Sequence, residues 1–165
     1  MREGCSMTNE GITTDVVIIG SGMAGLMAAL QLSKRRKVTI VTKSAIGAGN
    51  SEKAQGGIAA AISADDSTSS HIKDTLAAGF NHNNERVVNK LIEQAGPVMN
   101  MFFSWNTPFD RDDKGDFQLA KEGAHSRRRV FHAGGDATGF HMIKHVKEQC
   151  SKIYKCWNIL WLMIF

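Results

Sequence analysis

The chain has 165 residues, enough for one domain with a single hydrophobic core, and its 42% hydrophobic and 22% charged residues are typical of a globular protein. The net charge of +4 is modest, and Lys and Arg are spread along the chain, which argues against nucleic-acid binding. Cys5, Cys150 and Cys156 form no Cys-x-x-Cys pair and no spacing typical of metal ligands. We therefore expect a reducing compartment, the cytoplasm, and no disulfide framework.

Residues 1–14 are polar and lack an apolar core segment, so we expect a disordered leader without a signal peptide. The next stretch predicts strand, turn, helix and strand. Val16–Ile19 is an apolar, β-branched run typical of a buried strand. Good helix formers occupy residues 23–33, and residues 38–41 predict a second buried strand.

A Gly-x-Gly-x-x-Gly turn, residues 20–25, lies between the first strand and the helix. Gly20 permits a tight turn, Gly22 lets the backbone approach a pyrophosphate, and Gly25 lets the helix pack on the strand. The N–H groups at the start of the helix then face the phosphates. Because the turn sits inside a complete βαβ unit, it predicts dinucleotide binding; a glycine-rich loop without a ligand is the alternative.

The position about 20 residues after this turn departs from the usual fingerprint, which places a ribose-binding acid there. Val41-Thr42-Lys43 occupies it, so no carboxylate is available. This weakens a nicotinamide interpretation and leaves Lys43 to serve a phosphate or, through its backbone, a ribose.

Residues 43–57 are rich in Gly, Ser, Ala and Asn and end in the pair Gly56-Gly57 before an apolar run. Paired glycines there indicate either a second place where backbone approaches a ligand or a plain surface loop. The composition favours the two equally.

Helical spacing follows in three places. Ile72, Leu76 and Ala77 predict a helix that ends at Gly79, and Asn83 or Asn84 can cap a second helix. We expect Gly96-Pro97 to end that helix and Pro97 to begin a third, over residues 98–105. The Met and Phe residues of this third helix are predicted to belong to the core. The acidic loop after it, with Asp110, Asp112 and Asp113, lacks the pattern of a calcium loop, so a solvated turn is favoured over a metal site.

Residues 119–139 combine Glu122, His125 and His132 with glycines and arginines, which suits a site for a charged small molecule. The plainer interpretation, slightly favoured, places Glu122 and His125 on a solvated loop and makes Arg127–Arg129 an exposed face. Thr138 or Asp136 then caps a helix over residues 139–149. The remaining residues, 150–165, are largely apolar and too short to span a bilayer.

Taken together, the motifs resemble those of the succinate dehydrogenase and fumarate reductase flavoprotein superfamily, and within it the L-aspartate oxidases. The resemblance covers about residues 15–147 and rests on both glycine-rich stretches and on residues 74–79, 122–129 and 132–139. Glu-Gly-Ala-His-Ser-Arg-Arg-Arg at 122–129 is the more specific motif, because the dehydrogenase and reductase branch usually has a Phe-Gly-Gly-type sequence there.

The resemblance implies an α/β fold, the N-terminal part of a Rossmann-like FAD-binding domain with an incomplete parallel sheet flanked by helices. It implies non-covalent FAD, because Asn50 stands where membrane-complex relatives have a histidine attached to the flavin. The cofactor-binding residues that it implies are Gly20, Ser21, Gly22, Met23, Ala24, Gly25, Lys43, Asn50, Ser51, Gln55, Gly56 and Gly57.

The implied reaction is oxidation of L-aspartate to iminoaspartate, the first step of bacterial NAD synthesis. A hydride would pass from the α-carbon to flavin N5, and Glu122 would meet the substrate amine. Oxygen or fumarate would reoxidise the flavin, and quinolinate synthase is a candidate partner; neither membrane nor nucleic acid is implied. The alternatives are a fumarate reductase or succinate dehydrogenase-type flavoprotein and a non-catalytic nucleotide-binding remnant.

The sequence also departs from the family. Lys121 replaces an arginine and Ala124 a glycine, and the family's substrate-clamping arginines and histidines belong to later segments. We therefore expect a partial FAD-binding domain over residues 15–149, an atypical apolar tail at 150–165 that arose by truncation or frameshift, and little or no turnover by this chain alone.

Overall fold

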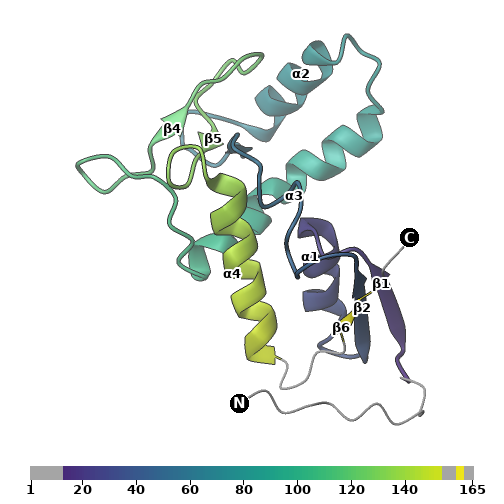
Figure 1. The fold of residues 1–165 in the computed structure, drawn as a ribbon. Helices are drawn as coiled ribbons and strands as arrows, with labels where there is room; N and C mark the ends of the chain where they lie inside the picture. Colours follow the sequence, from purple (N-terminus) through teal and green to yellow (C-terminus); the bar gives the residue numbers. More distant parts are fainter. Residues whose placement is uncertain (1–12, 154–158, 162–165) are drawn as a thin grey trace.

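A computed structural model of the chain describes residues 13–153 and 159–161 (Figure 1). Most of the expected leader, residues 1–12, and most of the expected apolar tail lie outside the described residues. Among the described helices, none combines the length and the apolar character that a membrane crossing requires.

A small parallel sheet lies at the lower right of the view in Figure 1. Strands β1 (Val16–Ile19) and β2 (Val38–Thr42) are joined by helix α1 (Met23–Leu32), as the sequence predicted. Val16 pairs with Val38 and Ile19 with Val41, and β6 (Ile159–Trp161) adds to the other edge of β2, giving the order β1-β2-β6.

The first strand is less buried than its apolar run predicted. Val17 is 55% and Ile19 87% exposed, while Ile18 packs against the core. The sequences of parallel strands are usually continuous apolar runs, because helices normally cover both faces of the sheet. In the described part of the chain, α1 covers the face of β1 that carries Ile18, and the other face is exposed, so the expectation of a buried strand was wrong.

A second, antiparallel sheet lies above the first and contains the short strands β3 (Ile58–Ala59), β4 (Leu119–Ala120) and β5 (Val130–Phe131) in the order β3-β5-β4. Helices α2 (Thr68–Ala78) and α3 (Glu85–Ser104) pack on each other beside it. Their N-caps are Ser67 and Asn84, whose side-chain oxygens accept hydrogen bonds from the first turns, Ser70 N and Val87 N.

The expected break at Pro97 was wrong, because helix α3 runs through Gly96 and Pro97 without interruption. A proline inside a helix removes one backbone hydrogen bond and costs about 3 kcal/mol. Here the C-terminal half buries Met99 and Phe102 completely, and that packing offsets the cost. The prediction that the Met and Phe residues of this segment belong to the core is confirmed.

Helix α4 (Thr138–Ile153) connects the two sheets and packs along α1 (Figure 1). It continues four residues beyond the expected end at Gln149. Cys150 is buried in the contact with α1, and its Sγ lies 3.8 Å from the carbonyl oxygen of Leu26. Residue 150, the first of the expected atypical tail, is therefore part of the packed core.

Candidate functional site

The glycine turn has the geometry that its sequence predicted. Gly20 adopts φ +104°, a conformation that favours glycine. A Cβ on Gly25 would collide with the carbonyl oxygen of Gly20, so the helix can lie this close to the strand only with glycine there. Gly22 caps α1 without a side-chain hydrogen bond, and no acidic residue occupies the first turn. The positive end of the helix is therefore not offset by a carboxylate in its first turn.

The Ser21 side chain holds the turn in place. It is buried, its Oγ lies 2.9 Å from Oγ1 of Thr42 at the end of β2, and it accepts a hydrogen bond from Gly47 N at 3.2 Å. The Ser21 hydroxyl is thus already hydrogen-bonded within the protein, so we expect a ligand to contact Ser21 through its backbone. No local sequence pattern indicates the Ser21–Thr42 pair, since the two residues are 21 positions apart.

A cavity of about 400 Å³ lies in front of this turn. Its lining comes from the ends of β1 and β2, the turn between β1 and α1, and the segment after β2: Ile19, Gly20, Ser21, Gly22, Val41, Thr42, Lys43, Ser44, Ala48, Gly49 and Asn50. Backbone and small side chains dominate, so a flat, phosphate-bearing ligand can approach the helix N-terminus closely. The donor set and the space fit half of a dinucleotide.

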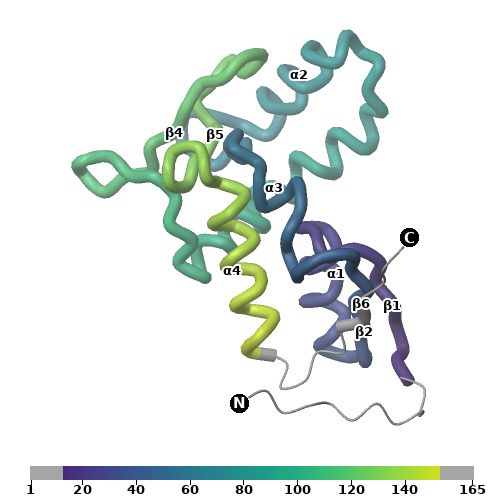
Figure 2. Tube along the Cα trace, in the orientation of Figure 1, coloured from purple at the N-terminus to yellow at the C-terminus, as the bar shows by residue number. Residues whose placement is uncertain are grey.

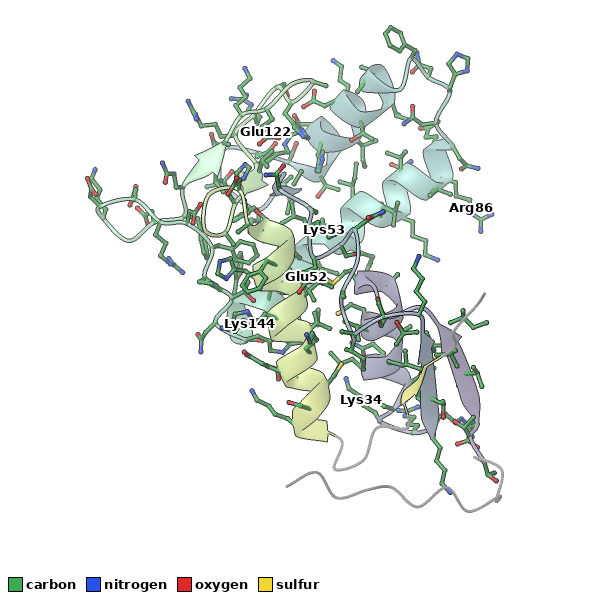
Figure 3. All side chains as sticks on the ribbon, viewed as in Figure 1. Lys34, Glu52, Lys53, Arg86, Glu122 and Lys144 are labelled. Carbon is green, nitrogen blue, oxygen red and sulfur yellow. The ribbon has the colours of Figure 1, made fainter. Side chains whose placement is uncertain are left out.

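Residues 43–57 run from β2 to β3 along the N-terminal end of α4 (Figure 2). Ser51 Oγ accepts a hydrogen bond from Met23 N at 3.3 Å, and Ala54 O accepts one from Gly139 N at 3.0 Å. Gln55 donates to Asp136 at 3.3 Å. Figure 3 shows Glu52 and Lys53 on this segment, between the two sheets. The segment therefore links the cavity at the glycine turn to the antiparallel sheet.

At the far end of this segment lies Glu122, labelled in Figure 3 near β4. Its Oε1 is 2.7 Å from Nε2 of His132, which directly follows β5. The carboxylate is half exposed, with 49% of its side-chain surface accessible. The structure thus brings together two residues of the predicted small-molecule site, although they are ten positions apart.

The third member of that group, His125, lies in a different environment. Its ring contacts the ring of His71 edge to face, with centroids 5.4 Å apart. His71 is buried, and burial together with the neighbouring Arg129 charge lowers its pKa. Its Nδ1 has no hydrogen-bond partner among the described residues.

The expectation that Arg127–Arg129 form an exposed face was wrong for Arg129, whose side chain is completely buried. Its Nε and Nη2 donate to the Asp66 carboxylate at 2.7 and 2.8 Å, and its Nη1 donates to Asp74 at 2.7 Å. Two acidic residues, one in the loop before α2 and one in the middle of α2, thus offset the burial of the guanidinium. No periodicity in the sequence signals such a pairing.

The two carboxylates stay ionised although burial opposes it. Burial alone would raise both pKa values, but hydrogen bonds from Arg129 hold the pKa of Asp66 below its ordinary value. For Asp74, the N–H and hydroxyl of Ser126, both at 2.7 Å, and Arg129 lower the pKa to about 2. Because Ser126 lies in the loop that carries Glu122, this ion-pair network fixes that loop to α2.

Two acidic residues of the 107–115 loop, Asp110 and Asp112, accept hydrogen bonds from the backbone. Asp110 accepts hydrogen bonds from the N–H groups of Gly134 and Gly135 at 2.8 and 3.0 Å, and Asp112 accepts from Lys114 N and Asp116 N. Within residues 13–153 and 159–161, no group of three His, Cys, Asp or Glu side chains could hold a metal ion.

The family comparison matches residues 15–162 to the FAD binding domain. L-aspartate oxidase from Bacillus subtilis (strain 168) is 41% identical over 140 residues, which is 85% of this chain and 26% of the relative. L-aspartate oxidase from Mesorhizobium japonicum is 45% identical over 124 residues, 74% of this chain and 24% of the relative. The chain thus spans about a quarter of the length of these relatives.

Solved structures agree in fold. A quinol fumarate reductase from E. coli superposes with a TM-score of 0.79 at 28% identity, covering 88% of this chain and 25% of that one. The Mycobacterium smegmatis Sdh1 complex superposes with a TM-score of 0.78 at 31% identity, covering 85% and 24%. The predicted α/β, FAD-binding fold is therefore confirmed.

Proposed function

The chain belongs to the family of FAD-binding domains, whose cofactor is FAD, and on this premise we propose that it forms the N-terminal part of the flavin site of an L-aspartate oxidase. The proposed reaction is oxidation of L-aspartate to iminoaspartate. One observation carries the proposal above all: the glycine turn opens into a cavity of about 400 Å³. From there, residues 43–57 lead to Glu122 and His132.

We assign the dinucleotide to the cavity and to the segment behind it. The N–H groups at the start of α1 and the backbone of Gly20–Gly25 would meet the pyrophosphate. Lys43, exposed on the cavity wall, would lie beside the adenosine half, and Asn50 and Ser51 would follow the pyrophosphate. Gln55, Gly56 and Gly57 would approach the isoalloxazine ring. Asparagine at position 50 makes this binding non-covalent.

FAD, when bound, supplies the acceptor for the hydride that leaves the substrate. The part that this chain adds is charge complementarity. Glu122 offers a half-exposed carboxylate, which suits the ammonium group of an amino acid. Succinate and fumarate lack that group, so the Glu122 carboxylate favours an amino-acid substrate over the alternative substrates of the fumarate reductase type.

The partners follow from the same proposal. L-aspartate would be the substrate, oxygen or fumarate the electron acceptor, and quinolinate synthase a candidate partner. A reducing cytoplasm is the setting in which the buried free thiol of Cys150 stays reduced.

The test is an absorbance spectrum of the purified 165-residue chain after incubation with FAD and removal of excess cofactor. We expect a flavin band at about 450 nm, and the flavin should be released into solution on denaturation, because non-covalent cofactors leave an unfolded protein. A colourless folded chain would contradict the proposal, and flavin that stays with the denatured protein would contradict its non-covalent part.

A matched pair of variants ties the flavin to the cavity. Gly49→Asp places a carboxylate on the cavity wall at a position where a side chain meets no neighbouring atom within 4 Å, so the fold tolerates it. The new charge repels phosphates, and flavin retention should fall at least tenfold. Gln94→Glu adds the same charge on the exposed surface of α3 and should leave retention unchanged.

A further inference from the structure

His132 stands between two groups that only accept hydrogen bonds. Its Nδ1 lies 3.2 Å from the carbonyl oxygen of Gly135, and its Nε2 lies 2.7 Å from Oε1 of Glu122. A carbonyl oxygen cannot donate, so Nδ1 carries a proton. A bare Nε2 would then face a carboxylate oxygen, lone pair against lone pair, at a distance typical of a charge-assisted hydrogen bond. On this assignment of the protons, the Nε2–Oε1 contact holds one proton and the pair as a whole is neutral.

The pair also touches the glycine loop. A Cβ placed on Gly57 would lie 3.0 Å from Nε2 of His132 and closer still to Val130 and to the Phe131 carbonyl. The backbone at Gly57 thus packs directly on the imidazole ring, with no side chain between them. Whatever ligand the Gly56-Gly57 loop contacts is consequently close to the shared proton.

The backbone that carries and contacts the ring is held by Asp110. The Asp110 N–H donates to the His132 carbonyl oxygen at 2.8 Å. The Asp110 carboxylate binds the N–H groups of Gly134 and Gly135, which fixes the carbonyl that receives Nδ1–H. Three successive contacts therefore run from Asp110 through the Gly134-Gly135 turn and His132 to Glu122.

We propose that His132 is a positioning residue that holds Glu122 beside the Gly56-Gly57 loop and neutralises its charge toward the flavin. This inference rests on the proposed function, because it requires the flavin ring to lie at that loop. Glu122 Oε1 is engaged by His132, which leaves Oε2 for the substrate ammonium group. The pair lets Glu122 attract the amine without placing a net negative charge next to the ring that must accept electrons.

The experiment measures the midpoint potential of the flavin in the FAD-loaded 165-residue chain by spectroelectrochemistry. His132→Gln leaves Glu122 as an unbalanced negative charge, which opposes the addition of electrons, so the potential should become more negative. The double variant His132→Gln with Glu122→Gln removes that charge and should return the potential close to the original value. Glu122→Gln alone should not lower it.

Lys121→Gln is the matched control, because it removes one exposed positive charge beside Glu122 without breaking the pair. We expect a much smaller shift than in His132→Gln. Equal shifts in His132→Gln and in the double variant would reveal a merely structural effect and overturn the inference, as would an unchanged potential in His132→Gln. A chain that retains no flavin would be recognised before any potential is measured and would overturn the proposed function and this inference with it.

Discussion

Arg129 and Asp66, 63 residues apart in the sequence, form a bidentate ion pair in which both side chains are fully buried. The guanidinium belongs to the segment that follows the Glu122 loop, and the carboxylate precedes α2. Asp74 on α2 completes the arrangement and also binds Ser126. The position of the Glu122 loop thus depends on charges that sit inside the protein, away from the cavity at the glycine turn.

Replacement of Arg129 by methionine should destabilise the fold severely. The variant leaves the buried Asp66 carboxylate without its partner, and breaking a buried ion pair in this way costs about 3–5 kcal/mol. That is a large part of the total stability of an ordinary domain. Urea unfolding followed by circular dichroism gives the loss in free energy of unfolding.

The matched control is Arg127→Met, which changes an exposed arginine two positions away and should alter stability by no more than about 0.5 kcal/mol. Arg129→Lys supplies a graded variant if Arg129→Met does not fold, because it keeps the charge and loses the bidentate geometry. Equal stabilities for Arg127→Met and Arg129→Met would show that the ion pair contributes nothing.

Acid should weaken the fold through Asp74. Its pKa is about 2 in the folded chain, below the ordinary aspartate value of 3.8 that applies to the unfolded chain. A carboxyl with a depressed folded pKa stabilises the protein above the unfolded value and loses that contribution as the pH falls toward the folded value. We therefore expect on the order of 2 kcal/mol to be lost between about pH 5 and pH 2. Asp66, whose pKa is also lowered, adds to the loss in the same direction.

Urea midpoints measured across that range check this prediction. Asp74→Asn should be less stable near neutral pH and should lose less stability on acidification. Asp113→Asn, at an exposed turn position, should keep the original pH dependence. An Asp74→Asn variant with the same acid sensitivity as the unmodified chain would rule out Asp74 as the source.

Local pattern was enough to predict the βαβ unit, because its determinants are neighbours in the sequence. The apolar strand, the glycine spacing and the helix formers all act within residues 16–42. The same reasoning failed at Pro97, where a strong local helix-breaking signal is outweighed by the burial of Met99 and Phe102. Tertiary packing decided that case, and no local pattern reports it.

The candidate site shows the same division. Glu122 was found from its motif, but its pairing with His132 depends on the register of β4 and β5, which brings the segments after these strands together. Arg129 was assigned to the surface because consecutive arginines usually lie there. Its burial requires Asp66 and Asp74, whose approach follows from the packing of α2 and leaves no periodicity in the sequence.

Gly25→Ala should destabilise the chain and abolish flavin retention. The new methyl group would meet the Gly20 carbonyl and the Ile18 side chain, so α1 must move away from β1. Overpacking of this kind costs about 1–3 kcal/mol and displaces the helix N-terminus that faces the phosphates. Urea unfolding and the flavin spectrum measure the two effects.

Gly96→Ala is the opposite control, since it is the same substitution inside α3. A Cβ there would make only an ordinary contact, 3.6 Å from the Ile62 side chain. Alanine is the better helix former, so this variant should gain about 0.5–1 kcal/mol. If both variants changed stability in the same direction, the close contact at Gly25 would not be the cause.

Cys150 should resist thiol reagents until the chain unfolds. Burial against α1 raises the pKa of its thiol to about 11 from an ordinary 9.0, so at a given pH about a hundredfold less of the reactive thiolate is present. In a Cys5→Ser, Cys156→Ser background, an aromatic disulfide reagent at about pH 8 should react far more slowly with the native chain than with the same chain in urea. The unfolded chain is the control for intrinsic reactivity.

The measurement also bears on where the packed domain ends, because Cys150 reaches the Leu26 carbonyl only if α4 stays helical and in contact with α1 through that residue. Reaction of the native chain at the rate of a free thiol would place residue 150 outside the core.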